Sequence, residues 1–128
     1  MTRERPGLPG TQSFDVASPA HAGWLGVQLG ELLDFAAAAA DWRDGGFDGL
    51  TTTGQREPGP KRLYATARMT YGFALGAMLG RPGCGELAGH GLQALRTIFR
   101  DSSDGGWFAE LSADGREVTR MIREQLGF

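Results

Sequence analysis

Glycine is strongly over-represented in this sequence, and its abundance restricts the possible folds. Glycine accounts for 21 of the 128 residues, or about 16%, against roughly 7% in ordinary proteins. These glycines follow no Gly-X-Y period, which excludes a collagen-like helix. Hydrophobic residues make up 41% of the chain, close to the globular norm, which argues against general disorder. We therefore expect the glycines to mark turns and close backbone approaches in a folded domain.

Composition excludes several classes of function. A length of 128 residues predicts one modest domain. The net charge of −2 argues against a broad basic face for nucleic acid. One cysteine, Cys84, excludes a disulfide framework and a cysteine-rich zinc site. The chain has neither an apolar run near the ~18 residues of a membrane span nor a secretory signal, so we expect a cytoplasmic protein without a membrane partner.

Apolar periodicity predicts a first long helix after a flexible leader at residues 1–19. A wide apolar stripe at helical spacing runs from His21 to Trp42 and includes the alanine run Ala36–Ala40. Glycine just after Asp44 should end this helix. Residues 45–60 are predicted to form a loop with a short strand at Leu50–Thr53, too polar to enter the core.

Two further helices and a hairpin complete the predicted plan. The second helix covers Lys61–Gly80, and the third covers Glu86–Arg100. A strand at Trp107–Leu111 should turn back through Ser112–Gly115, and residues 117–127 are predicted to form a short helix. The fold class is therefore all-α, with small β decorations.

Two similar segments, Asp44-Gly-Gly-Phe47 and Asp104-Gly-Gly-Trp107, suggest that a helical-hairpin unit occurs twice, as in an α/α array. Acidic residues beside these glycines fit turn and capping roles. Two of them, Asp44 and Asp104, could instead form the acid–base pair of a glycosidase. The acidic residues are Asp44, Asp48, Asp101 and Asp104.

The second helix carries the most informative group of side chains. At ~100° per residue, Tyr64, Arg68 and Tyr71 fall within about 60° of one another, and Leu75 continues the same face. A guanidinium offers five hydrogen-bond donors in a rigid fork, which suits a polyhydroxylated or anionic ligand. The other interpretation is an arginine stacked on tyrosines at a helix–helix interface and paired with a carboxylate. The residues themselves leave both open.

The remaining reactive side chains are better explained by structure. His21 lies at the start of the first helix, where a cap or an exposed side chain is expected. His90 lies on the third helix, where packing is the simpler explanation. Cys84 has no candidate base nearby and is expected to be structural. Trp107 and Phe108 suit either a sugar-stacking platform or the seal of a helical barrel.

Several motifs in this order resemble the N-acylglucosamine 2-epimerase family, which includes mannose isomerases, sulfoquinovose isomerases and cellobiose epimerases. They are Thr-Ala-Arg-Met within Leu63–Gly83, the segment His90–Leu95, and Asp-Gly-Gly-Trp-Phe at 104–108. The resemblance covers roughly residues 21–116. It implies a partial barrel domain at 20–116, while residues 117–128 form a divergent tail.

The resemblance implies the N-terminal part of an (α/α)6 barrel that binds a monosaccharide or disaccharide and interconverts free sugars by proton transfer between adjacent carbons. No cofactor or metal is implied. Arg68 is expected to act in catalysis by holding the sugar oxygens or the enediolate, and Tyr64 and Tyr71 to bind substrate. The family's two catalytic histidines lie on later helices and match neither His21 nor His90.

This mismatch leads to the expectation that the chain is a fragment and inactive alone. A partial barrel would leave apolar surface open, so a homo-oligomer formed through the open inner face is also expected. The alternative function is a non-catalytic helical module that self-associates and binds carbohydrate or a protein partner.

Overall fold

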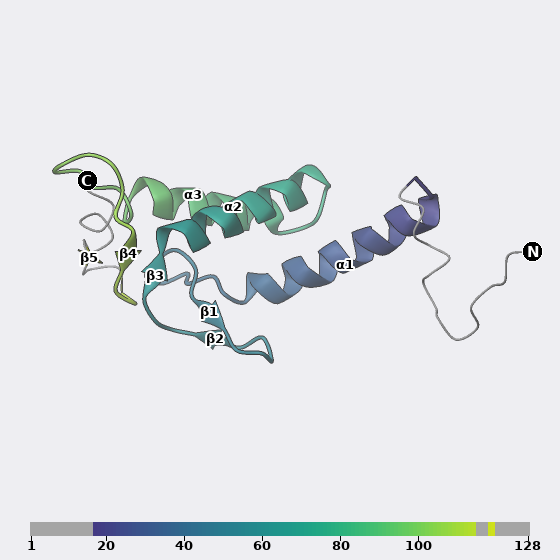
Figure 1. Ribbon diagram of the computed structural model, residues 1–128, viewed down its shortest axis with the longest axis horizontal. Coiled ribbons are helices and arrows are strands. Elements are labelled where there is room, and N and C mark those ends of the chain that lie inside the picture. The colour runs from purple at the N-terminus through teal and green to yellow at the C-terminus, as the bar shows by residue number, and fades with distance from the viewer. Residues whose placement is uncertain (1–16, 115–117, 120–128) are drawn as a thin grey trace, which may run out of the picture. The chain divides into compact units, whose positions relative to one another are not determined.

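The computed structural model describes residues 17–114 and 118–119 (Figure 1). Helices dominate it, and the strands are two residues long. The helices are α1 (Pro19–Ala37), α2 (Leu63–Met78) and α3 (Cys84–Arg96), and the strands are β1 (Gly49–Leu50), β2 (Arg56–Glu57), β3 (Lys61–Arg62), β4 (Glu110–Leu111) and β5 (Val118–Thr119). The helical plan with β decorations is therefore confirmed. Within the part of the chain that the structure describes, no helix combines the length and apolar character needed to cross a bilayer.

The chain divides within α1 into two units, Met1–Leu32 and Leu33–Phe128. In the first unit, the described residues are almost entirely helical. The His21 amide donates to Ser18 Oγ over 3.1 Å, which satisfies one of the free N–H groups of the first turn. The His21 ring also stacks on Trp24, with 6.0 Å between centroids. The capping side chain is therefore Ser18, and His21, expected to act as a cap or to be exposed, is partly buried against Trp24 instead.

The first helix ends earlier than the alanine run predicted. α1 stops at Ala37, and the next residues form a turn in which Ala39 and Ala40 are buried. The Ala39 carbonyl accepts the Asp48 amide over 2.8 Å, and Ala40 forms a β-bridge with Phe47. Tertiary burial and these bonds therefore outweigh the high helix propensity of alanine.

The pair α2 and α3 forms the centre of the second unit, lying side by side (Figure 1). A small residue allows close packing: a Cβ added at Gly91 would lie 1.9 Å from Thr70 Oγ1. Nearer the C-terminal end of α2, Gly76 contacts Cys84 of α3, and a Cβ added at Gly76 would lie 2.7 Å from Cys84 Sγ. Cys84 is buried in this contact, as expected for a structural residue.

The predicted boundaries of both helices need correction. Lys61 and Arg62 belong to β3, so α2 begins at Leu63 and ends at Met78, and α3 begins at Cys84 and ends at Arg96. The physical reason for the first change is strand pairing, since Lys61 lies opposite Leu111 and Arg62 opposite Glu110. The third helix starts early because Gly83 takes a left-handed conformation, with φ 82°, that ends the preceding turn.

Part of the loop after α1 is buried, although its sequence is polar. Phe47 and Asp48 are buried, so the prediction that residues 45–60 stay out of the core was wrong. Phe47 stacks on Phe73 with 5.7 Å between centroids. The predicted strand starts earlier, as β1, and pairs antiparallel with β2. A loop can enter the core here because its buried backbone and carboxylate find partners.

A hydrophobic cluster lies where the end of α3 meets β4. It contains Ala94, Phe99 and Leu111, all buried. The predicted hairpin is confirmed, since β4 pairs antiparallel with β5, but its first strand begins at Glu110 rather than at Trp107, which forms an isolated bridge with Arg100. The predicted helix at 117–127 was wrong at Val118–Thr119, where strand pairing prevails; its other residues lie outside the described part of the chain.

The two glycine-containing loops have the same backbone design. Asp41 Oδ1 accepts the amides of Arg43 and Asp44, each over 3.0 Å. Asp101 Oδ1 accepts the amides of Ser103 and Asp104, also over 3.0 Å.

Both loops then close in the same way. The Asp41 amide donates to the Gly46 carbonyl and the Asp101 amide to the Gly106 carbonyl, each over 3.0 Å. Gly46 and Gly106 have φ 72° and 75°, a region that disfavours other residues. The repeat suggested by the sequence is therefore present. The capping role predicted for Asp101 is confirmed, and in the first loop the capping residue is Asp41, which was not predicted.

Candidate functional site

The exposed face of α2 carries the side chains that the sequence singled out. Tyr64 is 53% and Tyr71 67% exposed, and Arg68 between them is exposed as well. The opposite face is buried through Thr66, Thr70, Phe73 and Gly76. One helix thus separates a packing face from an open face of two aromatic rings and one cation.

Arg68 lies over the aromatic ring of Tyr64. Its guanidinium carbon lies 5.2 Å from the centroid of the Tyr64 ring, a distance typical of a cation–π contact. The α2–α3 interface is lined by other residues, and no ion pair of Arg68 is present among residues 17–114 and 118–119. The tyrosine stack is thus confirmed, while its predicted place at a helix–helix interface is not.

Tyr64 is itself tied to the short sheet. Arg62 Nη1 donates to Tyr64 Oη over 3.3 Å, and this bond is the main reason that the pKa of Arg62 is raised. Arg62 Nε also lies 3.7 Å from Glu110 Oε1. Because Arg62 and Glu110 are directly paired in β3 and β4, the sheet connects to the exposed face of α2.

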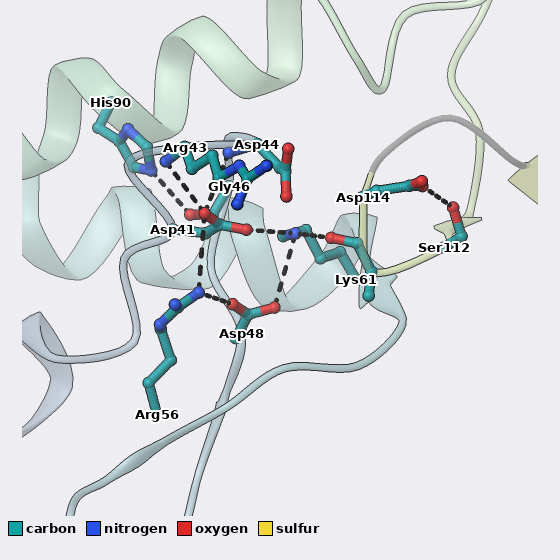
Figure 2. A network of polar contacts seen from close by, with 11 residues as sticks. Asp41, Arg43, Asp44, Gly46, Asp48, Arg56, Lys61, His90, Ser112 and Asp114 are labelled. Atoms are coloured by element: carbon teal, nitrogen blue, oxygen red, sulfur yellow. Dashed lines mark hydrogen bonds and ion pairs between the residues drawn. The ribbon is translucent and has the colours of Figure 1, made fainter.

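A buried ionic network lies immediately before α2 (Figure 2). Lys61 is 1% exposed, and its Nζ lies 2.9 Å from Asp41 Oδ2 and 3.6 Å from Asp48 Oδ1. Lys61 Nζ also donates to the Ala113 carbonyl. A buried ammonium requires such partners, because desolvation without them is very costly.

Arg56 completes the network from the solvent side. Its Nη1 lies 2.7 Å from Asp48 Oδ2 and 3.7 Å from Asp41 Oδ1. Figure 2 shows Asp48 between Arg56 and Lys61. The expected turn role of Asp48 is therefore replaced by ion pairing, since its carboxylate points to two cations from different strands.

The network sets the charge state of Asp41. Burial raises the pKa of this carboxyl, but the hydrogen bonds from the Asp44 amide and Lys61 and the Lys61 charge outweigh burial. The pKa of Asp41 consequently lies below its ordinary value of 3.8. A charged Asp41 holds the loop, β3 and the start of α2 together, and so fixes where Arg68 emerges.

His90 has a packing role, as expected. Its Nε2 lies 2.7 Å from the Gly46 carbonyl, which makes this nitrogen the donor. The ring contacts Trp42 at 4.3 Å and the edge of Phe47 at 5.4 Å between centroids. These contacts join α3 to the first glycine loop.

The half-exposed Trp107 side chain is held by two contacts. Its Nε1 donates to the Leu95 carbonyl over 2.9 Å, and the Arg100 guanidinium lies 5.0 Å from its ring. Phe108 packs against the Ala94–Phe99–Leu111 core. These contacts favour sealing the end of a helical layer over a sugar-stacking platform.

The buried network was missed at the sequence level. One signal for it exists, since Lys61 is the single lysine of the whole sequence. It follows a proline-glycine segment and precedes an apolar helix. A single lysine at such a position indicates a specific structural or functional role. Its partners lie 20 and 13 residues earlier, so local pattern could not identify them.

Comparison with known proteins connects this geometry to a family. Residues 45–122 match the family model described as N-acylglucosamine 2-epimerase (GlcNAc 2-epimerase). The chain belongs to the N-acylglucosamine 2-epimerase family. It is 41% identical over 105 residues to a D-mannose isomerase of Pseudomonas cannabina pv. alisalensis, and 40% identical over 102 residues to one of Thermobifida fusca.

These matches involve 81% and 77% of the chain, but 25% and 24% of the relatives. The chain thus spans about a quarter of the length of the curated relatives that it matches.

Solved structures support the same placement. A cellobiose 2-epimerase from Spirochaeta thermophila matches with TM-score 0.63 and 28% identity, over 82% of this chain and 28% of that one. A cellobiose 2-epimerase from Bacillus thermoamylovorans matches with TM-score 0.59 and 21% identity, over 72% and 26%; this likeness shows the fold. The described chain therefore has the fold of part of an (α/α)6 barrel.

Proposed function

We propose that the chain is the sugar-binding part of an aldose–ketose isomerase or 2-epimerase that transfers a proton between adjacent carbons of a free sugar. Arg68 would hold the substrate oxygens and the enediolate, and Tyr64 and Tyr71 would contact the substrate. The observation that carries this proposal is the exposed Tyr64–Arg68–Tyr71 face of α2. Support comes from the D-mannose isomerases that match at about 40% identity.

The chemistry explains why an arginine suits this position. Removing a proton beside a carbonyl places negative charge on oxygen, and a permanently charged, forked donor stabilises that charge as it develops. Tyrosine rings beside the cation offer apolar faces to the C–H side of a sugar. Binding and charge stabilisation can therefore be supplied from one face of α2.

Proton transfer itself needs a base and an acid. His90 is engaged with the Gly46 carbonyl and two aromatic rings. We therefore propose that the 128 residues bind sugar but do not turn it over unaided. The proton-transfer groups would come from family helices not represented in this sequence.

The test is binding and turnover of D-mannose by the wild-type chain, Arg68→Ala and the matched control Arg96→Ala. Arg96 is an exposed arginine in the last turn of α3. We expect Arg68→Ala to lose at least tenfold in affinity, about 1.4 kcal/mol, and Arg96→Ala to bind as wild type. Equal affinity of all three proteins would contradict the role of Arg68, and turnover by the wild-type chain would contradict inactivity.

A second candidate is a non-catalytic helical module that self-associates. The observation that favours it is the exposure of Leu75 and Met78 on α2 and of Leu79 directly after it. Light scattering on the purified chain decides this point. A concentration-independent monomer that binds mannose would rule self-association out, and a stable oligomer without sugar affinity would favour the module.

A further inference from the structure

The two tyrosines beside Arg68 differ in their contacts. Arg68 lies over the Tyr64 ring at 5.2 Å, and the Tyr64 hydroxyl accepts a hydrogen bond from Arg62. For Tyr71, 67% exposed, no ring contact occurs within the part of the chain that the structure describes. Tyr64 is thus engaged on both its ring face and its hydroxyl, whereas Tyr71 is open.

We propose that Tyr64 is a positioning residue that holds the Arg68 guanidinium ready for a sugar, leaving Tyr71 as the ring that contacts it. This inference rests on the proposed function for Arg68 and Tyr71, and it replaces the substrate contact proposed above for Tyr64 with a positioning role. A sugar cannot stack on the ring face that the Arg68 guanidinium covers. The hydroxyl of Tyr64 points to Arg62 and so fixes the ring from its other end.

The anchor for Tyr64 comes from outside α2. Arg62 and Glu110 face each other across β3 and β4, with 3.7 Å between Arg62 Nε and Glu110 Oε1. The connected series is Glu110, Arg62, Tyr64 and Arg68. It joins the β3–β4 strand pair to the exposed cation one helical turn beyond Tyr64.

Positioning matters because arginine is long and flexible. Ordering a free, exposed arginine on binding costs rotamer entropy, and a guanidinium that is already stacked has less to lose. Cation–π contacts at exposed sites are weak, so the expected benefit is modest. It corresponds to about a two- to fivefold gain in sugar affinity.

The test uses the full chain and the arginine Nε–Hε signals in proton–nitrogen correlation spectra. Ring currents should shift the Arg68 Hε signal upfield in wild type, and Arg68→Lys assigns it. In Tyr64→Leu we expect this signal to move toward the free-arginine position and its heteronuclear NOE to fall. Tyr64→Phe, which keeps the ring, should retain the upfield shift but show a smaller NOE.

The chain provides an internal control. Arg100 stacks on Trp107 at 5.0 Å, far along the chain from Tyr64, and its Nε–Hε signal should be unchanged in every Tyr64 variant. Far-UV circular dichroism confirms that α2 is intact, as expected for a residue that is 53% exposed.

D-mannose titrations complete the test. We expect Tyr64→Leu to bind about two- to fivefold more weakly, and Arg68→Ala to lose binding. An unchanged Arg68 signal in Tyr64→Leu would overturn the proposal. So would complete loss of mannose binding in that variant, because it would place the sugar on Tyr64 itself. If the wild-type chain binds no mannose, the proposed function fails, while the Arg68 signal still decides whether Tyr64 orders the cation.

Discussion

Replacing Lys61 with methionine should strongly destabilise the fold. The side chain keeps its length and loses its charge, which removes from Asp41 and Asp48 the buried one of the two cations that they share. Removing one partner of a buried ion pair costs about 3–5 kcal/mol. We expect the lower end, about 3 kcal/mol, because Asp48 keeps Arg56 at 2.7 Å and Asp41 keeps two backbone N–H donors.

The neighbouring residue provides a matched control. Arg62 is next to Lys61 on the same strand, its side chain is 59% exposed, and its carboxylate partner Glu110 is 3.7 Å away. A solvent-exposed pair of this kind contributes little to stability. Arg62→Met therefore removes one positive charge from β3 at little expected loss of stability.

Urea unfolding followed by circular dichroism at pH 7 measures both effects. With a slope of about 1–3 kcal/mol per molar urea, a loss of 3 kcal/mol lowers the midpoint by about 1–3 M. Arg62→Met should lower it by no more than a third of that amount. If Lys61→Met shifts the midpoint no further than Arg62→Met, the argument that the buried network holds β3 and α2 in place is refuted.

Three further perturbations test other parts of the structure. Because the pKa of Asp41 is below 3.8 in the folded chain, its contribution to stability is complete above that value and is lost as the pH falls through the folded pKa. Urea midpoints measured at decreasing pH should show this loss in the wild-type chain and less of it in Asp41→Asn. Gly91→Ala should destabilise the fold by about 1–3 kcal/mol, since its Cβ would collide with Thr70. Gly89→Ala, which has nothing within 4 Å of the added Cβ, should stabilise α3 by about 0.5–1 kcal/mol. Equal urea midpoints for the two variants would contradict the close packing of α2 and α3. Asp101→Ala removes the acceptor of two loop amides and should cost about 1–3 kcal/mol, and an unchanged thermal midpoint would show that this carboxylate does not hold the loop.

The face of α2 was predictable because it depends on local spacing. Tyr64, Arg68 and Tyr71 share a face through the helical repeat alone, and the structure exposes all three. The stack of Arg68 on Tyr64 follows from the same four-residue spacing. What these side chains bind stays a prediction.

Element boundaries and buried charges were not predictable in the same way. The alanine run has high helix propensity, yet α1 ends at Ala37, because burial and hydrogen bonds to a later loop decide that boundary. Local spacing predicts a helix that includes Lys61, although pairing with Leu111, 50 residues later, makes it a strand residue. Each error arises where a partner distant in sequence outweighs a local preference.

The helical class, the repeated aspartate-glycine loops, the α2 face and the family resemblance could all be read from the amino-acid sequence. All of these are encoded in residue type and short-range spacing. The tertiary structure alone decided that Asp41, Asp48, Arg56 and Lys61 meet in one network (Figure 2). The reason is that ion pairing in a protein interior depends on distance in space and on exclusion of water, and neither quantity can be obtained from the order of residues along a chain.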